Sequence, residues 1–264
     1  MFRQRLLSAL VGIPLVVLLI WQGGVAIFVA IIFISSLALR EFYTLCSLEN
    51  RLVRTLGYAG NILLLTVAGL ANPEAYFFAL IVFFIVLNLV AVFAYPQDYQ
   101  ELMILLWGAL YITSLLAFFL WLRATANGFL LLLSVLVTTW ASDTGAYACG
   151  LTLGRHKLIP AVSPKKSLEG AVGGLLFAAA AMSLVFAPLL NLNPLTALLL
   201  GVAISFVGQC GDLAESALKR RGKIKDSGKF LPGHGGVLDR LDSLLFAVPV
   251  GYYLLLALAA KGGI

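Results

Sequence analysis

The chain has 264 residues, of which 61% are hydrophobic and only 11% are charged, and its mean hydropathy is +1.02. This composition excludes a soluble globular domain and indicates a polytopic membrane protein built of α-helices. A transmembrane barrel would need short segments of alternating hydrophobicity, and none are evident. The net charge of +6 attracts anionic headgroups and polyphosphates. We exclude nucleic acid as a partner, because no base-reading module or aromatic platform accompanies the charge.

Runs of about 20 apolar residues, each long enough to cross a hydrocarbon core of about 30 Å, recur along the chain. We predict nine transmembrane helices from them, at residues 5–21, 24–46, 55–71, 75–95, 101–122, 127–149, 169–190, 194–220 and 239–260. Glycine, asparagine and proline residues punctuate the breaks between these runs. No linker separates a soluble domain, so the chain is interpreted as a single integral membrane domain, residues 1–264.

Lysine and arginine residues are distributed unequally between the connections on one side of the membrane and those on the other. If the N-terminus is cytoplasmic, all of the 18 basic residues except Arg123 and Lys261 lie on the cytoplasmic side. This bias predicts a cytoplasmic N-terminus and a C-terminus on the opposite side. It also places the two large polar connections, after the sixth and the eighth helix, together on the cytoplasmic side.

The eighth predicted helix carries a polar face. Asp212, Glu215, Ser216 and Lys219 fall at positions i, i+3, i+4 and i+7, so their side chains share one side of a helix. This face is expected to point into the protein or a wet cavity, because carboxylates rarely face lipid. An ion pair between Glu215 and Lys219 that only ties helices together is the alternative for those two residues. It does not apply to Asp212, which lies deeper and has no obvious local cation.

Two more carboxylates, Asp239 and Asp242, lie three residues apart at the start of the last helix. Oxygen ligands from two segments suit a hard cation such as Mg²⁺, which takes one or two carboxylates and reaches a substrate phosphate. We therefore predict a metal site in which Asp212 and Asp239 are the main pair. The alternative for Asp239 or Asp242 is a helix-start role, in which the carboxylate caps amides and compensates the helix dipole.

A glycine-rich turn, Gly233-His234-Gly235-Gly236, comes just before the last helix. Its backbone amides and the positive end of the helix could hold an anion. Basic residues around the turn favour this interpretation: Lys219, Arg220, Lys225, Lys229 and Arg240. His234 could bind phosphate, orient a neighbour or close the turn. A solvated loop that obeys the positive-inside rule would explain the basic residues, but not the interleaved Asp226, Asp239 and Asp242.

A second polar block runs from Trp140 to Gly170. Asp143 lies there in an apolar run, among small residues that permit close helix packing; hydrogen bonding to neighbouring helices alone is its alternative role. The segment Ser163-Pro164-Lys165-Lys166-Ser167 is predicted to be a loop entering a helix, with Ser167 as the N-cap. Its two lysines suit a phosphate-rich ligand, although ordinary positive-inside charge would also account for them.

Six other acidic residues lie at helix ends or in connections, where a solvated role suffices. They are Glu41, Glu49, Glu74, Asp98, Glu101 and Glu169.

The segment from Ser216 to Asp242 resembles the signature of the phosphatidate cytidylyltransferases, also called CDP-diacylglycerol synthases. It reads Ser-x-Leu-Lys-Arg-x4-Lys-Asp-x-Gly-x2-Leu-Pro-x-His-Gly-Gly-Val-x-Asp-Arg-Leu-Asp, with many polar positions at fixed spacing. The blocks 142–145 and 163–167 are similar to that family as well. The resemblance covers roughly residues 140–249, while the first five helices match only in being hydrophobic.

This resemblance implies transfer of CMP from CTP to phosphatidate, which gives CDP-diacylglycerol and pyrophosphate for phospholipid biosynthesis. It also implies dependence on Mg²⁺, assistance by a monovalent cation such as K⁺, and a homodimer. The protein would be integral to the bacterial cytoplasmic membrane, with its active site facing the cytoplasm. The catalytic half would span about residues 127–260, and residues 5–122 would form the N-terminal helices.

The predicted site combines groups that neutralise charge with groups that position two phosphates. The residues predicted to be catalytic are Asp212, Asp239, Lys166, Lys219 and Arg220. Those predicted to bind substrate are Ser216, Lys165, Lys225, Asp226, His234, Gly235, Gly236, Arg240 and Asp143. The predicted metal ligands are Asp212, Asp239 and Asp242. No strong base is needed, because phosphatidate is already an oxyanion at neutral pH.

Two alternatives remain open. A related CTP-dependent lipid enzyme, such as a polyprenol kinase or an archaeal-type lipid cytidylyltransferase, would share the nucleotide chemistry and differ in its acceptor. An ion-coupled secondary transporter would use Asp143, Asp212 and Glu215 as an ion path. The transporter predicts symmetric halves, whereas the polar residues of this chain crowd into its C-terminal half.

Overall fold

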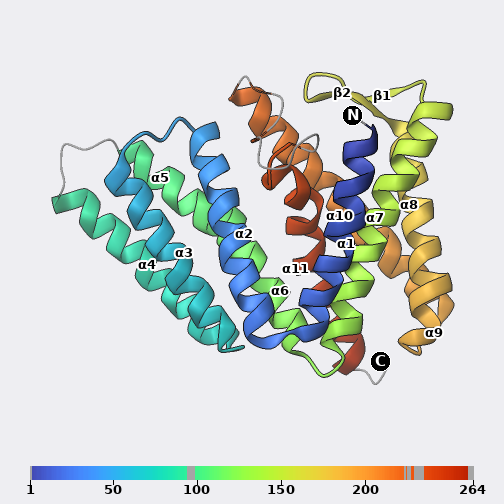
Figure 1. Ribbon diagram of the computed structural model, residues 1–264, viewed down its shortest axis with the longest axis horizontal. Helices are drawn as coiled ribbons and strands as arrows, with labels where there is room; N and C mark the ends of the chain where they lie inside the picture. The colour runs from blue at the N-terminus through green and yellow to red at the C-terminus, as the bar shows by residue number, and fades with distance from the viewer. Residues whose placement is uncertain (1, 94–98, 223, 225–226, 229–234, 261–264) are drawn as a thin grey trace. The chain divides into compact units, whose positions relative to one another are not determined.

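The computed structural model describes residues 2–93, 99–222, 224, 227–228 and 235–260, and helices dominate these residues (Figure 1). The N-terminal elements are α1 (Phe2–Gln22), α2 (Gly24–Leu45), α3 (Arg51–Gly69), α4 (Pro73–Phe93), α5 (Tyr99–Gly108), the π-helical turn η1 (Ala109–Ser114) and α6 (Leu115–Ala124). The elements that follow are α7 (Gly128–Thr152), β1 (Lys157–Ile159), β2 (Ser163–Ser167), α8 (Leu168–Ala181), the π-helical turn η2 (Met182–Phe186), α9 (Ala187–Leu189), α10 (Pro194–Arg221) and α11 (Leu238–Ala260).

Eight helical segments among the described residues are long and apolar enough to cross a membrane. They are α2, α3, α4, the continuous segment Tyr99–Ala124, α7, the continuous segment Leu168–Leu189, α10 and α11. In addition, α1 contains the shorter apolar stretch Leu10–Gln22. These nine segments match the predicted helices to within a few residues at each end. The prediction of an all-α, multi-pass membrane protein is therefore confirmed, while the cytoplasmic N-terminus stays a prediction.

Asparagine side chains cap three of the described helices, and two of these asparagines lie at breaks that a proline marks. The Oδ1 atom of Asn72 accepts a hydrogen bond from the amide of Ala75 at 3.1 Å, just before α4. The Oδ1 atom of Asn193 likewise accepts from the amide of Leu195 at 2.9 Å, at the start of α10. A proline follows each of these two asparagines, and its missing N–H matters least in the first helical turn.

The chain divides into two compact units. Unit 1 consists of Met1–Ala126 together with Ile224–Asp239, and unit 2 consists of Asn127–Lys223 together with Arg240–Ile264. The segment that precedes α11 thus groups with the N-terminal helices, although it comes late in the sequence.

Unit 1 contains a buried polar network inside its apolar core. The amide nitrogen of Asn61, on α3, donates to the hydroxyl of Ser35, on α2, at 2.9 Å. Thr113, in η1, donates to Asn61 Oδ1 at 2.8 Å. The side chain of Asn61 is only 1% exposed. Because an apolar environment offers no water to these groups, the hydrogen bonds hold three helical segments in one register.

Replacing Asn61 by alanine is expected to lower the free energy of unfolding by about 1–2 kcal/mol, because Thr113 loses its acceptor and a small cavity remains. Unfolding of the purified protein in detergent measures this effect. Thr66→Ala is the matched control, because it removes an exposed hydroxyl from the same helix and is expected to cost less than about 0.5 kcal/mol. Equal unfolding curves for the two variants would contradict the role assigned to the network.

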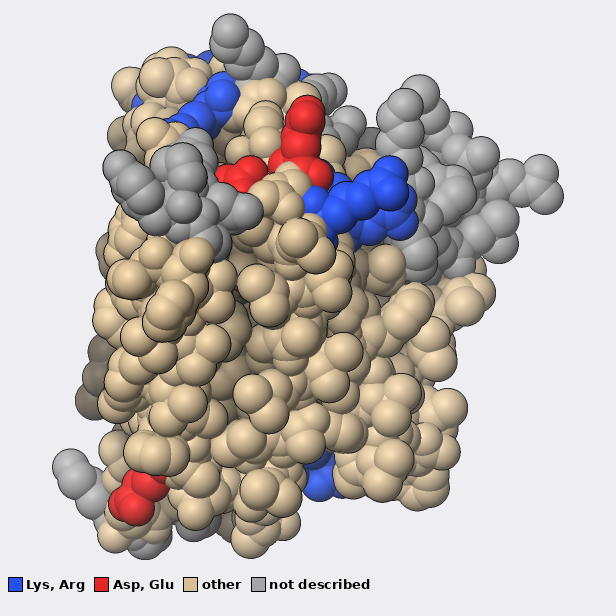
Figure 2. Space-filling view, turned by 90° about the vertical axis from the view of Figure 1, so that its left-hand side faces the viewer, with Lys and Arg blue, Asp and Glu red and all other residues tan. Residues whose placement is uncertain are grey.

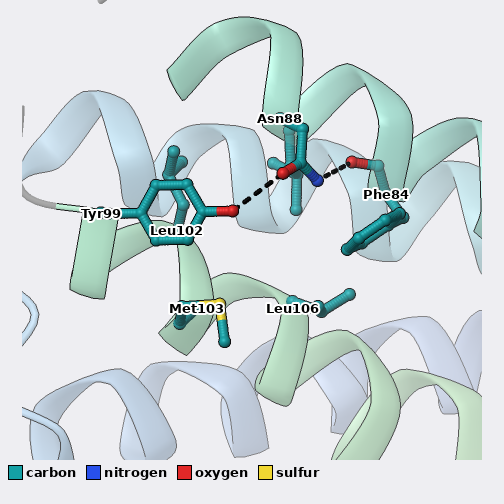
Figure 3. Close-up of a pocket in the computed structure, with 7 residues that line it drawn as sticks. Phe84, Asn88, Tyr99, Leu102, Met103 and Leu106 are labelled. Carbon is teal, nitrogen blue, oxygen red and sulfur yellow. Dashed lines mark hydrogen bonds between the residues drawn. The ribbon is translucent and has the colours of Figure 1, made fainter. Parts of the chain in front are cut away.

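A shallow pocket in unit 1 lies between α4 and α5 (Figure 3). Its walls are formed by Phe84, Leu87, Asn88, Tyr99, Leu102, Met103 and Leu106. The hydroxyl of Tyr99 donates to Asn88 Oδ1 at 2.8 Å, and Asn88 in turn donates to the carbonyl of Phe84 at 2.8 Å. The lining of the pocket is otherwise apolar and includes none of the predicted site residues. The pocket therefore offers no phosphate-binding chemistry.

In unit 2, glycines let α7 and α8 pack closely. A side chain at Gly145 would collide with Phe177 and with the carbonyl of Gly173, and one at Gly173 would collide with Cys149. Such stripes of small residues are a common way for membrane helices to approach one another. The close pair carries Asp143 on α7, and the ribbon of β1 and β2 joins the two helices (Figure 1).

On the face drawn in Figure 2, lysine, arginine, aspartate and glutamate side chains gather near the two ends, and a broad band without charge lies between them. This distribution is expected of a protein that spans a bilayer, because charges inside the hydrocarbon are costly.

Candidate functional site

The polar face predicted for the eighth helix is present on α10. Lys219 forms an ion pair with Glu215 one turn away, and the side chain of Glu215 is fully buried. Ser216 Oγ donates a long hydrogen bond of 3.4 Å to Asp212 Oδ1. The ion pair considered for Glu215 and Lys219 therefore exists, and it compensates a carboxylate whose burial would otherwise be costly.

Asp212 has a cation that the sequence did not reveal. The ammonium group of Lys166, on β2, lies 2.6 Å from Asp212 Oδ2. About 27% of the Lys166 side chain and 30% of the Asp212 side chain are exposed, so a ligand from solution could reach both groups. The sequence around Asp212 contains no such partner, because this lysine comes from a different element.

Two further carboxylates of unit 2, Asp143 on α7 and Asp242 on α11, lie close enough to Asp212 for their charges to interact. Asp143 also interacts electrostatically with two cations, Lys166 and Arg240. Residues from α7, β2, α10 and α11 thus form one group of mixed charge, which we call the charged cluster: Asp143, Lys166, Asp212, Glu215, Lys219, Arg240 and Asp242.

A glycine on α10 permits the approach of α11 within this cluster. A side chain at Gly211 would collide with the carbonyl oxygen of Asp242 and would be in tight contact with the side chain of Phe246. Asp212 and Asp242 are therefore carried by two helices that touch through backbone atoms, which brings their carboxylates near each other without a long side chain between them.

The lysine-rich segment before α8 is a strand, not the predicted loop. β2 pairs with β1 in an antiparallel ribbon, with Lys157 opposite Ser167. The predicted N-cap is confirmed, because Ser167 Oγ accepts from the amide of Gly170 at 3.1 Å. The pattern of proline and lysine predicts an irregular loop here, but backbone pairing with β1 makes the segment a strand. Arg220 Nε also donates to the carbonyl of Val162, next to the strand, at 3.0 Å. Lys165 is exposed on this ribbon.

Glu169 also contributes to the ribbon, although the sequence indicated only a solvated role. Its carboxylate accepts hydrogen bonds from the amides of Arg155 and His156 at 3.1 and 3.2 Å, and its Oε1 lies 2.6 Å from His156 Nδ1. A carboxylate in the first turn of α8 thus ties down the start of the ribbon, which carries Lys166.

In unit 1, Asp239 lies in the first turn of α11. Its Oδ2 atom accepts from the amide of Gly236 at 2.8 Å, and from both the amide and the hydroxyl of Ser227 at 3.0 Å. This is the helix-start role that we considered as the alternative for Asp239. The Gly236 amide therefore donates to a carboxylate of the chain itself, and its predicted contact with substrate stays a prediction.

The turn before α11 requires a glycine at one position. Gly235 has a φ angle of +86°. Residues that have a β-carbon rarely adopt this backbone conformation. A β-carbon there would also collide with the carboxylate of Asp239. Gly235 thus permits the tight approach of the turn to Asp239, while its predicted contact with substrate stays a prediction.

Glu41, on α2, has a role that its sequence surroundings did not reveal. We assigned it a solvated role, but its side chain is buried and accepts three hydrogen bonds. The donors are the amides of Val237 and Leu238, at 2.9 and 2.8 Å, and the hydroxyl of Ser227, at 2.9 Å. A carboxylate near the end of an apolar helix was the one local signal, and its partners are almost 200 positions away in the chain.

The remaining predicted residues fall into two groups. Arg220 and Arg240 are described and exposed. Lys225, Asp226 and His234 lie outside the described residues, so their roles stay predictions.

The oxygen donors of the charged cluster fit a Mg²⁺ ion, which needs only one or two carboxylates and completes its shell with water or phosphate oxygens. Two of the predicted metal ligands, Asp212 and Asp242, lie in unit 2, and their binding of a metal stays a prediction. No three histidine, cysteine, aspartate or glutamate side chains converge on one metal position in the part of the chain that the structure describes. Asp239 belongs to unit 1, so its pairing with Asp212 stays a prediction.

The chain matches the model of one protein family and is similar to several proteins from bacteria. The model of the cytidylyltransferase family matches residues 3–258. The phosphatidate cytidylyltransferase of Bacillus subtilis (strain 168) is 33% identical over an alignment of 271 positions. This alignment covers 96% of this chain and 97% of the relative.

Two other relatives are more similar over a shorter region. The phosphatidate cytidylyltransferase of Staphylococcus haemolyticus (strain JCSC1435) is 43% identical over 134 residues, or 50% of this chain and 52% of the relative. The uncharacterized protein YnbB of Escherichia coli (strain K12) is 51% identical over 128 residues, or 48% of this chain and 43% of the relative. The matched part of this chain thus spans about half the length of each of these two relatives.

Proposed function

Because this chain belongs to the cytidylyltransferase family, we propose that it transfers a cytidylyl group from CTP to phosphatidate. The products are CDP-diacylglycerol and pyrophosphate. The observation that carries the proposal is the charged cluster, in which Asp212 pairs with Lys166 beside Asp143 and Asp242. Similarity to phosphatidate cytidylyltransferases over nearly the full length supports the choice of acceptor.

The reaction joins two groups that repel each other. A phosphate oxygen of phosphatidate attacks the α-phosphorus of CTP and forms a new phosphorus–oxygen bond. The bond from the α-phosphorus to the oxygen that bridges it to the β-phosphate breaks, and pyrophosphate leaves with the electron pair. The attacking oxygen is already ionised, so catalysis rests on neutralising charge and on aligning the two phosphates.

The cations of the charged cluster are suited to this task. Lys166 and Lys219 are each held by a carboxylate, Asp212 and Glu215 respectively, so both ammonium groups are oriented before substrate arrives. Lys166 is partly exposed and would exchange its contact with Asp212 for a substrate phosphate. Arg240 and Arg220 would bind the triphosphate or the lipid phosphate, which planar guanidinium groups contact through two hydrogen bonds.

Asp212 and Asp242, or Asp212 and Asp239, would hold Mg²⁺ at this site. The ion supplies positive charge to phosphate oxygens when it is bound. A monovalent cation such as K⁺ is part of the proposal as a second ion. Asp212 would then alternate between two cationic partners, the ammonium group of Lys166 and the metal.

The site is proposed to open to the cytoplasm, where CTP is available and where the positive-inside rule places the basic connections. Phosphatidate would present its phosphate at the depth of the lipid headgroups. We further propose that the protein acts as a homodimer in the cytoplasmic membrane.

The proposal is tested with purified protein, CTP labelled at the α-phosphate, phosphatidate in mixed micelles, and Mg²⁺. Label is expected to move into the lipid fraction as CDP-diacylglycerol, with one pyrophosphate released for each lipid formed. Removing Mg²⁺ with a chelator is expected to stop the transfer.

Different acceptors separate this function from its alternatives. Diacylglycerol, which lacks the attacking phosphate, is the matched control and is expected to remain unlabelled. Transfer of the γ-phosphate of CTP to a polyprenol would identify a kinase instead. Ion flux into vesicles without any turnover of CTP would identify a transporter and refute the proposed reaction.

A further inference from the structure

The contacts of Glu41 point to a role beyond helix packing. Its two carboxylate oxygens share three donors: Oε1 accepts from the amide of Val237, and Oε2 accepts from the amide of Leu238 and the hydroxyl of Ser227. Val237 precedes α11 and Leu238 is its first residue. Glu41 therefore satisfies backbone donors that a helix start leaves without intrahelical partners, and it does so from a different helix.

Ser227 connects Glu41 to Asp239. Its hydroxyl oxygen lies 2.9 Å from Glu41 Oε2 and 3.0 Å from Asp239 Oδ2. A hydroxyl has a single proton, so the two carboxylates share one donor. The amide of Ser227 donates to the same oxygen of Asp239 at 3.0 Å. A displacement of Glu41 would consequently reach the Asp239 carboxylate through Ser227 and through the backbone of residues 236–238.

The chemistry of the three donors requires a carboxylate at position 41. Each oxygen of Glu41 faces at least one backbone N–H. A glutamine would place its NH₂ group opposite one of those N–H groups, whichever way the amide is turned, because an amide has only one acceptor oxygen. The negative charge also lies at the N-terminal end of α11, where the helix dipole stabilises it.

We propose that Glu41 is a positioning residue for the transfer reaction, which orients the Asp239 carboxylate by anchoring Ser227 and the first turn of α11. The inference rests on the proposed function, in which Asp239 acts on the metal or the substrate phosphates. Glu41 itself does not touch the reacting atoms in this role.

Glu41→Gln tests the proposal, because it keeps the size of the side chain and removes one acceptor. Transfer activity is expected to fall about 10- to 100-fold, the range found when a group that orients a ligand is lost. The loss is expected in kcat more than in the KM for CTP, and the Mg²⁺ concentration for half-maximal rate is expected to rise. Glu49→Gln is the matched control, because it removes an exposed carboxylate just beyond the same helix and is expected to leave all three parameters unchanged.

A second pair of variants distinguishes the proposed role of Glu41 from a general loss of folding. Ser227→Ala removes the shared hydroxyl and leaves the amide contacts of Glu41 in place, so a smaller loss of activity is expected. When Ser227→Ala is combined with Glu41→Gln, the loss is expected to be less than the product of the two single losses, because both act through one contact. Independent, multiplying losses would show that the two residues do not act together.

Hydrogen exchange provides a readout that needs no turnover. The amides of Val237 and Leu238 are expected to exchange faster in Glu41→Gln than in Glu49→Gln, and peptides from α4 are expected to be unaffected. Unchanged exchange together with unchanged kcat would overturn the proposal, and so would a lower unfolding temperature with normal activity per folded molecule. A wild-type protein without transferase activity would refute the proposed function, whereas the exchange comparison would still report on the contact of Glu41.

Discussion

Replacing Asp212 by asparagine is expected to reduce cytidylyl transfer by about 10³-fold, while the protein remains folded. Asparagine has nearly the same shape as aspartate and keeps an oxygen that can accept from Ser216. It loses the charge that holds Lys166 at 2.6 Å and that would bind the metal. Loss of one preorganised electrostatic group costs about 10²–10³-fold in rate, and here two interactions depend on the same charge. The transfer assay with labelled CTP measures the effect.

The role of Asp212 is separated from a general loss of charge by two comparisons. Glu49→Gln also removes one negative charge, from an exposed position, and is expected to retain full activity. Lys166→Met is expected to impair transfer without abolishing the response to added Mg²⁺, because Asp212 remains. If Asp212→Asn retained more than about a tenth of the wild-type rate, the two roles proposed for Asp212, binding the metal and orienting Lys166, would both be wrong.

Replacing Lys219 by methionine is expected to destabilise the protein by about 3 kcal/mol, which is the largest stability effect that we anticipate. The carboxylate of Glu215 is fully buried, and removing the ammonium group paired with it takes away compensation for a charge held out of water. Breaking one partner of a buried ion pair typically costs about 3–5 kcal/mol. Unfolding in detergent, monitored by loss of helical circular dichroism, measures the change.

The double variant Lys219→Met with Glu215→Gln distinguishes this explanation from lost packing. Removing both charges is expected to recover most of the stability, because a neutral glutamine is far less costly to bury than a carboxylate. If the double variant were as unstable as Lys219→Met alone, the stem of the lysine and not its charge would be responsible. Transfer activity is expected to stay low in both variants, because Lys219 is also one of the cations proposed to act on the substrate phosphates.

The fold could be predicted from local properties of the chain. A segment such as Pro73–Phe93 is apolar over its entire length, and nothing beyond its own composition is needed to predict a membrane span. The asparagine caps at Asn72 and Asn193 are equally local, since the side chain binds an amide two or three residues away. The same holds for Ser167, which caps α8 as expected.

The local pattern was misleading where a contact between distant segments decides the structure. The strand at Ser163–Ser167 exists because it pairs with Lys157–Ile159, and a proline and two lysines do not encode that pairing. The unusual residues were found, since Asp143, Asp212 and Asp242 stand out in apolar surroundings. Their partners could not be identified in the same way.

The amino-acid sequence by itself determined the positions of the helices, the polar face of α10 and the set of residues with chemistry to offer, because these depend on composition and on the helical period. Only the tertiary structure decided which polar groups meet. Lys166 pairs with Asp212, and Glu41 accepts from the amides at the start of α11. Hydrogen bonds and ion pairs act over about 3 Å, so such partners are chosen by the packing of elements far apart in the chain.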